Sequence, residues 1–95
     1  MSDLNAKTPL NYSGWPCEEN VTPSDTVSFA PSWLEIMVAG TIKYKNAGSG
    51  QDVIKVVTEA MCPYYPRSPV TMVYNTGTDV AFDTAGTLSR TYNPR

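Results

Sequence analysis

Residues Trp33 to Lys45 read W-L-E-I-M-V-A-G-T-I-K-Y-K, with apolar side chains at every second position along the stretch. The positions that share this parity, with Gly40 as the single gap, are Leu34, Ile36, Val38, Ile42 and Tyr44. Successive side chains of a β-strand point to opposite faces of the sheet, so this alternation is typical of a strand with one buried face. The stretch predicts one long strand over 33–45, with Leu34, Ile36, Val38 and Ile42 in the core.

Shorter strands are expected on either side of this one, separated by turns rich in Gly, Pro, Asn and Asp. They are predicted over Thr26–Ala30, Asp52–Thr58, Val70–Tyr74, Val80–Phe82 and Thr87–Tyr92. A helix over Gln51–Met61 is a competing interpretation of one segment, and Met61–Pro69, with its three prolines, is expected to be irregular. This spacing of short strands predicts an all-β fold, a small antiparallel β-sandwich (jelly-roll-like) or small barrel.

The first 25 residues differ from the rest of the chain. They are polar, hold three of the eight prolines and show neither helical nor strand periodicity. Such a segment cannot bury enough apolar surface to fold alone, which leaves an arm ordered against a partner or a loose terminus. Trp15 favours the arm, because a large aromatic side chain is costly to leave in water. We therefore expect an extended N-terminal arm over 1–25 and a β-sandwich domain over 26–95.

Composition excludes several classes of partner. The net charge is -2 and the basic residues are scattered, which argues against nucleic acid and against an anionic membrane surface. No stretch approaches the roughly 20 apolar residues of a membrane span, and the first residues do not resemble a signal peptide. We expect synthesis in a cytoplasm and no membrane insertion. In that compartment two free thiols are favoured over a Cys17–Cys62 bridge, although the bridge remains open.

The chain offers little catalytic chemistry. It contains no histidine, which removes the commonest general base, the Ser-His-Asp arrangement and most zinc sites. The pairs Glu18-Glu19 and Asp79/Asp83 could act as paired carboxylates, but we interpret them as solvated surface acids. Asp79 and Asp83 also lack the spacing of a calcium loop. We expect a protein that is not an enzyme and has no metal or cofactor.

Two groups of side chains are candidates for binding. The first is a contact loop of Tyr64, Tyr65 and Arg67, which lie between prolines that stiffen the backbone. The alternative interpretation of this loop is a crossover between two layers whose tyrosines cap the core. The second group belongs to the arm and consists of Leu10, Tyr12 and Trp15.

Short motifs in this order resemble the small β-sandwich modules of tailed-bacteriophage virions. Gly40-Thr41-Ile42 is similar to a "G-x-I/V" step of those modules. The segment 65–69 is similar to their "G-Y-R-P-S" segment with Pro and Arg exchanged, and 83–87 is similar to their "D-x-x-G-x-L/I" turn. The chain departs from the tail-fibre members in having no fibre shaft and no coiled-coil heptads.

The resemblance implies a virion structural protein, a capsid decoration or cement module displayed on the particle surface. Its partner would be the major capsid or neck protein of the same virion, contacted through the arm. A receptor-binding module that recognises a host-surface glycan through Tyr64, Tyr65 and Arg67 is the alternative. The same resemblance implies a homo-oligomer, with a homotrimer favoured, and Met37 and Ala39 on the outer face of the long strand support self-association.

Overall fold

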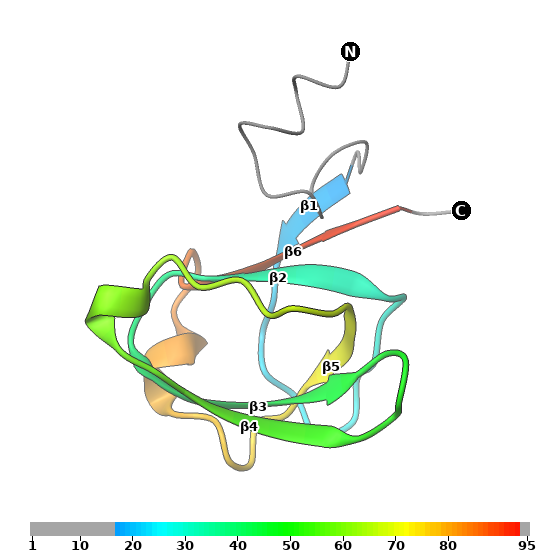
Figure 1. The fold of residues 1–95 in the computed structure, drawn as a ribbon, viewed down its shortest axis with the longest axis horizontal. Helices are drawn as coiled ribbons and strands as arrows, with labels where there is room; N and C mark the ends of the chain where they lie inside the picture. The colour runs from blue at the N-terminus through cyan, green and yellow to red at the C-terminus, as the bar shows by residue number, and fades with distance from the viewer. Residues whose placement is uncertain (1–16, 94–95) are drawn as a thin grey trace.

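The computed structural model describes residues 17–93 and contains six β-strands in one antiparallel sheet (Figure 1). The strands are β1 (Cys17–Asn20), β2 (Ser32–Ile36), β3 (Gly40–Asn46), β4 (Asp52–Val57), β5 (Val70–Val73) and β6 (Leu88–Tyr92). Two short 3₁₀ helices, η2 (Glu59–Met61) and η3 (Val80–Asp83), lie in the connections. The strand order is β1-β6-β2-β5-β3-β4, which confirms the predicted all-β antiparallel fold.

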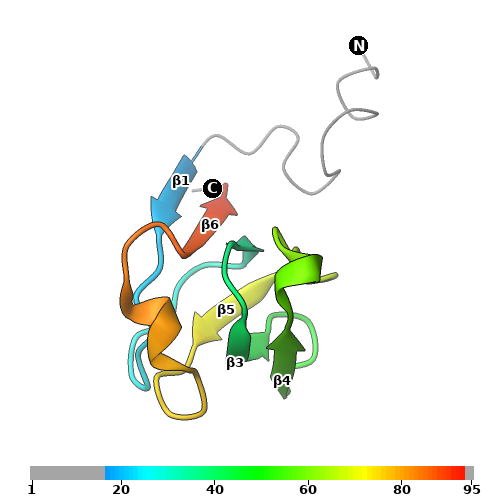
Figure 2. The same ribbon diagram turned by 90° about the vertical axis from the view of Figure 1, so that its left-hand side faces the viewer.

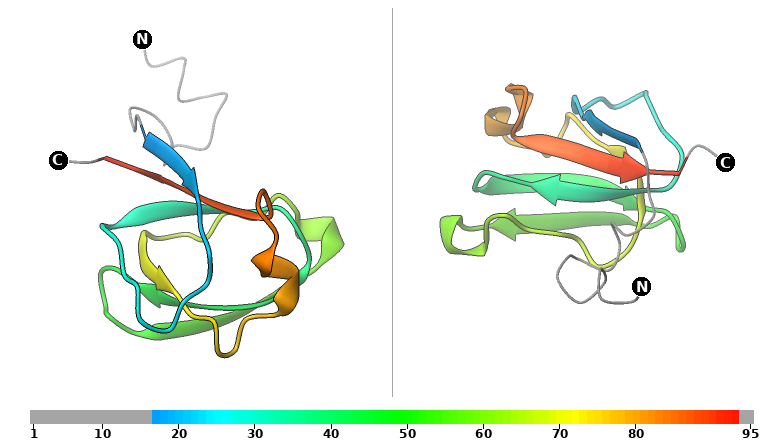
Figure 3. Two further views of the ribbon diagram at one scale, coloured as in Figure 1. Left: turned by 180° about the vertical axis from the view of Figure 1, so that it is seen from behind. Right: turned by 90° about the horizontal axis from the view of Figure 1, so that it is seen from above.

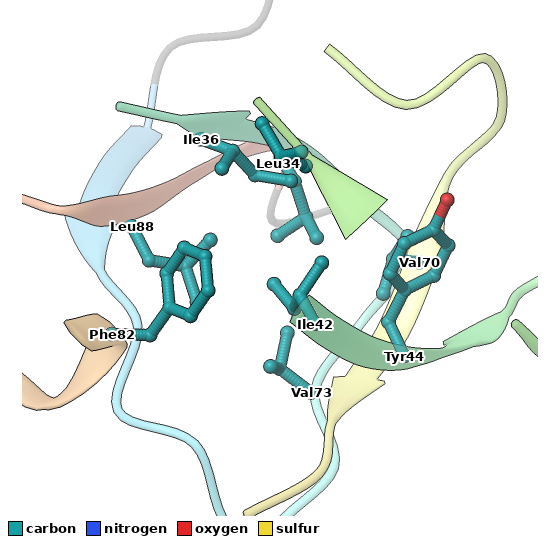
Figure 4. Close-up of a cluster of buried hydrophobic side chains, with 9 residues drawn as sticks. Leu34, Ile36, Ile42, Tyr44, Val70, Val73, Phe82 and Leu88 are labelled. Carbon is teal, nitrogen blue, oxygen red and sulfur yellow. The ribbon is translucent and has the colours of Figure 1, made fainter. Parts of the chain in front are cut away.

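The sheet curls until its two halves face one another. In Figure 1 the layer of β6 and β2 lies above the layer of β3 and β4, and β5 links them at one side. Seen from behind, the chain after β1 passes across the opening between the two layers (Figure 3). The space between the layers is filled by the core shown in Figure 4, which comprises Leu34, Ile36, Ile42, Tyr44, Val57, Val70, Val73, Phe82 and Leu88.

The predicted single strand over 33–45 is wrong, because the chain changes layers within it. β2 ends at Ile36 and β3 begins at Gly40, so residues 37–39 form a corner and Val38 lies outside any strand. Gly40 has φ +150°, and a Cβ there would lie 3.1 Å from Phe82 Cε2. A side chain at this position would therefore be both strained and crowded. The parity survives the corner, since Leu34, Ile36 and Ile42 are fully buried and Val38 is partly buried against the core.

The shorter strands were predicted with mixed success. Those over 52–58, 70–74 and 87–92 are confirmed as β4, β5 and β6, and only η2 remains of the competing helix. No strand forms over Thr26–Ala30, where the Ser24 hydroxyl accepts hydrogen bonds from the backbone N–H groups of Thr26 and Val27. Such local bonds compete with a strand ladder. The segment Val80–Phe82 is part of η3 and not a strand.

The sheet begins earlier in the sequence than the predicted domain does. Residues 17–20, assigned from the sequence to the arm, form β1 and pair along their whole length with β6. Val21 continues the contact, since its backbone N–H donates to the carbonyl of Leu88 at 2.9 Å. β1 thus forms one edge of the sheet, and β4 forms the other. Figure 2 shows these two strands on opposite sides of the domain.

Candidate functional site

The predicted contact loop runs alongside β2 and joins the two layers. Ile36 and Tyr64 exchange backbone hydrogen bonds of 2.9 and 2.8 Å, and at the other end of β2 Ser32 pairs with Val70. The prolines between these two points lack the N–H group that a continuous ladder needs, so the strand is interrupted there. The loop is therefore an extended crossover that covers the second side of β2.

The tyrosines of this loop lie largely against the domain. The Tyr64 ring packs on the core, and Lys55 Nζ lies 5.3 Å from its centroid. Tyr65 donates a hydrogen bond of 2.9 Å from its hydroxyl to Glu35 Oε2. Burial, reinforced by this bond to a carboxylate, raises the pKa of Tyr65 above its ordinary value.

Arg67 differs from the two tyrosines because it is exposed, next to the buried Pro66. Its neighbour Ser68 accepts a hydrogen bond from the side-chain amide of Asn46, which fixes the loop to the turn after β3. The three residues of the predicted contact loop thus differ in exposure. Two half-buried tyrosines make the contacts expected of a crossover, and one arginine is presented to solvent.

The other predicted group, Leu10, Tyr12 and Trp15, lies outside the described residues. The structure describes instead the strand to which this segment is joined, β1.

A cluster of side chains around Arg90, which we call the Arg90 clamp, holds β1 to the domain. Its members are Glu19 of β1, Ser32 of β2, Arg90 and Tyr92 of β6, and Phe29 of the connection between β1 and β2.

The Arg90 guanidinium donates hydrogen bonds from its nitrogens and lies over two aromatic rings. Nη2 donates to Glu19 Oε1 at 2.8 Å, and Nη1 donates to the hydroxyl of the fully buried Ser32 at 2.7 Å. The guanidinium carbon lies 3.8 Å from the ring centroid of Tyr92 and 4.6 Å from that of Phe29. Arginine suits this position because its planar group forms directed hydrogen bonds while it stacks on aromatic rings. Only 11% of its side chain is exposed.

The clamp also sets the protonation of its members. Glu19 accepts from Arg90 and, through Oε2, from the Tyr92 hydroxyl at 3.0 Å. These hydrogen bonds, with that of Arg90 the larger cause, hold the pKa of Glu19 below its usual range. The bond to Glu19 in turn raises the pKa of Tyr92. The lowered pKa of Glu19 favours the carboxylate form that pairs with Arg90.

Sequence analysis did not identify the Arg90 clamp. One signal was present, because Arg90 shares the parity of Leu88 and Tyr92 along its strand, and Leu88 is buried. An arginine on an inward position needs a partner, since an unpaired buried charge is unfavourable. The partner, Glu19, lies 71 residues earlier, and no local spacing connects the two.

A groove of about 410 Å³ adjoins the clamp. Glu19, Arg90 and Phe29 form one part of its lining, and Val21, Val27 and Val73 contribute apolar surface. The arrangement could receive an apolar group beside a charged pair.

Cys17 and Cys62 are both free. Within residues 17–93, no group of three or more His, Cys, Asp or Glu side chains could hold a metal ion.

Comparison of the chain with protein-family models, with curated protein sequences and with solved structures found no match. In the described part of the chain, no helix has the length and apolar character needed to cross a membrane.

Proposed function

We propose that this chain is a non-catalytic structural module of a tailed-bacteriophage virion that docks on the capsid or neck protein through the segment before β1. The observation that supports the proposal best is the attachment of β1 to the rest of the domain. All four residues of β1 pair with β6, and the Arg90 clamp adds an ion pair and hydrogen bonds from Glu19. The segment that precedes Cys17 is thus joined to a rigid sheet and not to a loop.

The anchor residues of the proposal are close to this fixed point in the sequence. Trp15 is two positions before Cys17 and Leu10 is seven positions before it. An extended chain spans at most about 3.5 Å per residue, so the Cα atoms of these residues lie within roughly 7 and 25 Å of that of Cys17. An aromatic anchor seated in a partner at that range would hold the domain close to the particle surface.

A second candidate function is recognition of a host-surface glycan by the crossover loop. Arg67 is exposed, and the backbone around it is held by the buried Pro66 and by the contact of Ser68 with Asn46. Contact residues in many binding proteins are arginine and aromatic side chains on loops fixed by a scaffold. This function uses a surface separate from β1, so substitutions can distinguish it from particle attachment.

The experiment measures binding to capsids that lack the protein, by co-sedimentation. Removal of residues 1–15 leaves β1 intact, so the truncated domain is expected to fold and to lose binding. Trp15→Ala is expected to weaken binding by about 2 kcal/mol or more, roughly 30-fold, if Trp15 is a central anchor. Leu4→Ala, an apolar truncation elsewhere in the arm, is the matched control and should bind as the wild type does.

One outcome would contradict the proposal, and a separate assay tests the second candidate function. If the truncated domain decorates capsids as well as the full chain, attachment does not depend on the arm. If Arg67→Ala abolishes binding to host cells while particle binding is unchanged, the glycan-recognition function is supported for the loop. A circular dichroism spectrum of each variant establishes that the domain is folded.

A further inference from the structure

β4 has one side that bonds to β3 and one side that bonds to no strand in the described part of the chain. Asn46 donates its backbone N–H to the carbonyl of Gln51 at 2.8 Å, just before β4 begins. Hydrogen-bonded pairs alternate along an antiparallel ladder, so Val53, Lys55 and Val57 follow Gln51 in bonding to β3. The residues between them, at positions 52, 54 and 56, therefore direct their backbone groups to the open side.

Two of the three exposed side chains of β4 are apolar, and the third is Asp52. Ile54 and Val56 are 65% and 63% exposed and lie on the outer face. Natural proteins usually protect an edge strand with charges, prolines or bulges. The opposite edge, β1, has such protection, because it carries the exposed acid Glu18. The exposed β-branched side chains of β4 have no comparable neighbour at the edge.

The two charged residues of β4 are engaged within their own chain. Asp52 contacts Lys45 Nζ at 3.5 Å and accepts a hydrogen bond of 2.7 Å from the Tyr74 hydroxyl, so its carboxylate is held over β3 and β5. Lys55 places its ammonium 5.3 Å from the Tyr64 ring centroid, on the inner side. Both charges are thereby drawn away from the open edge.

We propose that this edge pairs with β4 of a second copy of the chain, antiparallel, about a twofold axis. Antiparallel pairing of a strand with itself is compatible with such an axis, and it is the contact of a closed dimer. The contact would satisfy the open N–H and C=O groups of both copies. It would also bring the exposed Ile54 and Val56 side chains of the two copies into one apolar strip on the outer face.

Charge excludes one register of this contact. With the axis at Ile54, each Lys55 lies opposite Val53 of the second copy, and each Asp52 lies opposite Val56. With the axis at Lys55, the two lysines lie opposite one another, and like charges in opposed positions are destabilising. The register that we propose is the one centred on Ile54, which avoids this opposition and places the exposed Ile54 side chains of the two copies opposite one another.

This dimer differs from the homotrimer that the phage resemblance implies. A closed trimer needs a head-to-tail contact between two different surfaces. Using both sheet edges would place the acidic β1 of one copy beside β4 of the next. The dimer uses β4 alone and leaves β1 and the segment before it accessible, so it is compatible with the proposed attachment and is tested independently of it.

Sedimentation velocity of the full chain at tens of micromolar tests the proposal. The wild type is expected to sediment with twice the mass of one chain, and Ile54→Lys with the mass of one. Val80→Lys is the matched control, because Val80 is a valine 82% exposed on η3, away from β4, and this variant should stay dimeric. A wild-type monomer, a wild-type trimer or loss of the dimer in Val80→Lys would overturn the proposal.

Amide hydrogen exchange locates the contact. Pairing should slow exchange at Asp52, Ile54 and Val56, whose N–H groups face the open side, and dilution below the dissociation constant should restore fast exchange there. A dimer in which these amides exchange rapidly would place the interface elsewhere and overturn the proposal. The unfolding midpoint of Ile54→Lys, expected to match that of diluted wild type, shows that the variant is folded.

Discussion

Replacement of Phe82 by alanine tests the arrangement of η3 in the core. Phe82 is 1% exposed, and its ring packs in the cluster that contains Leu88 (Figure 4). Val80, two positions earlier in the same helix, is 82% exposed. Truncation of a buried phenylalanine costs about 3–5 kcal/mol through lost transfer energy and the cavity left behind. A domain of this size has roughly 5–14 kcal/mol of stability, so the variant should lose about a fifth of it or more.

Urea denaturation followed by tryptophan fluorescence measures the effect. At an m-value of about 1–3 kcal/mol/M, the midpoint of Phe82→Ala should fall by at least about 1 M. Val80→Ala is the matched control and should change stability by no more than about 0.5 kcal/mol. In a strand, positions 80 and 82 would share one face, whereas a 3₁₀ turn separates them. Equal losses in the two variants, or a loss below about 1 kcal/mol in Phe82→Ala, would refute the arrangement.

Three further predictions concern the corner, the core and acid stability. Gly40→Ala should destabilise by roughly 1–3 kcal/mol in urea, from strain and crowding, while Gly48→Ala, with no crowding and no positive φ, should have little effect. Ile36→Asp should prevent folding, as seen by loss of the native circular dichroism spectrum, because an unpaired charge would enter a fully buried position. Hydrogen bonds from Thr76 lower the pKa of Asp25, so the stability it contributes is present above about pH 4 and is lost as pH falls further; Asp25→Asn should flatten the acid limb of the stability profile.

Period-two alternation determined which side chains of residues 33–45 face the core. Leu34, Ile36 and Ile42 are buried as the pattern predicts, because an inward position stays inward when the chain bends around the core that it lines. The pattern could not show that the stretch is two strands in two layers. Only Gly40, the gap in the alternation, marks the bend, and its requirement for glycine comes from Phe82 and Asp79, about 40 residues away in sequence and 3.1 Å from its would-be Cβ.

Local sequence also determined the irregular crossover and the strands at 52–57, 70–73 and 88–92, since prolines, β-branched runs and turn residues act over a few positions. It could not distinguish a short strand from a 3₁₀ turn at 80–83, because a segment of four residues is too short to show the periodicity of either structure. Nor did it place Cys17–Asn20 in the sheet, because a polar segment without alternation becomes a strand only when β6 supplies its hydrogen-bond partners.

The surfaces that carry the proposals were decided by tertiary structure. The pairing of β1 with β6 places Glu19 opposite Arg90, where it neutralises the guanidinium. The connection between β1 and β2 brings the Phe29 ring against the same guanidinium. β4 has an open edge because it is the last strand in the sheet order and pairs with β3 alone. Sequence specifies the composition of each strand, but which strand lies at an edge is set by the order of strands, and that order depends on contacts between residues distant in the chain.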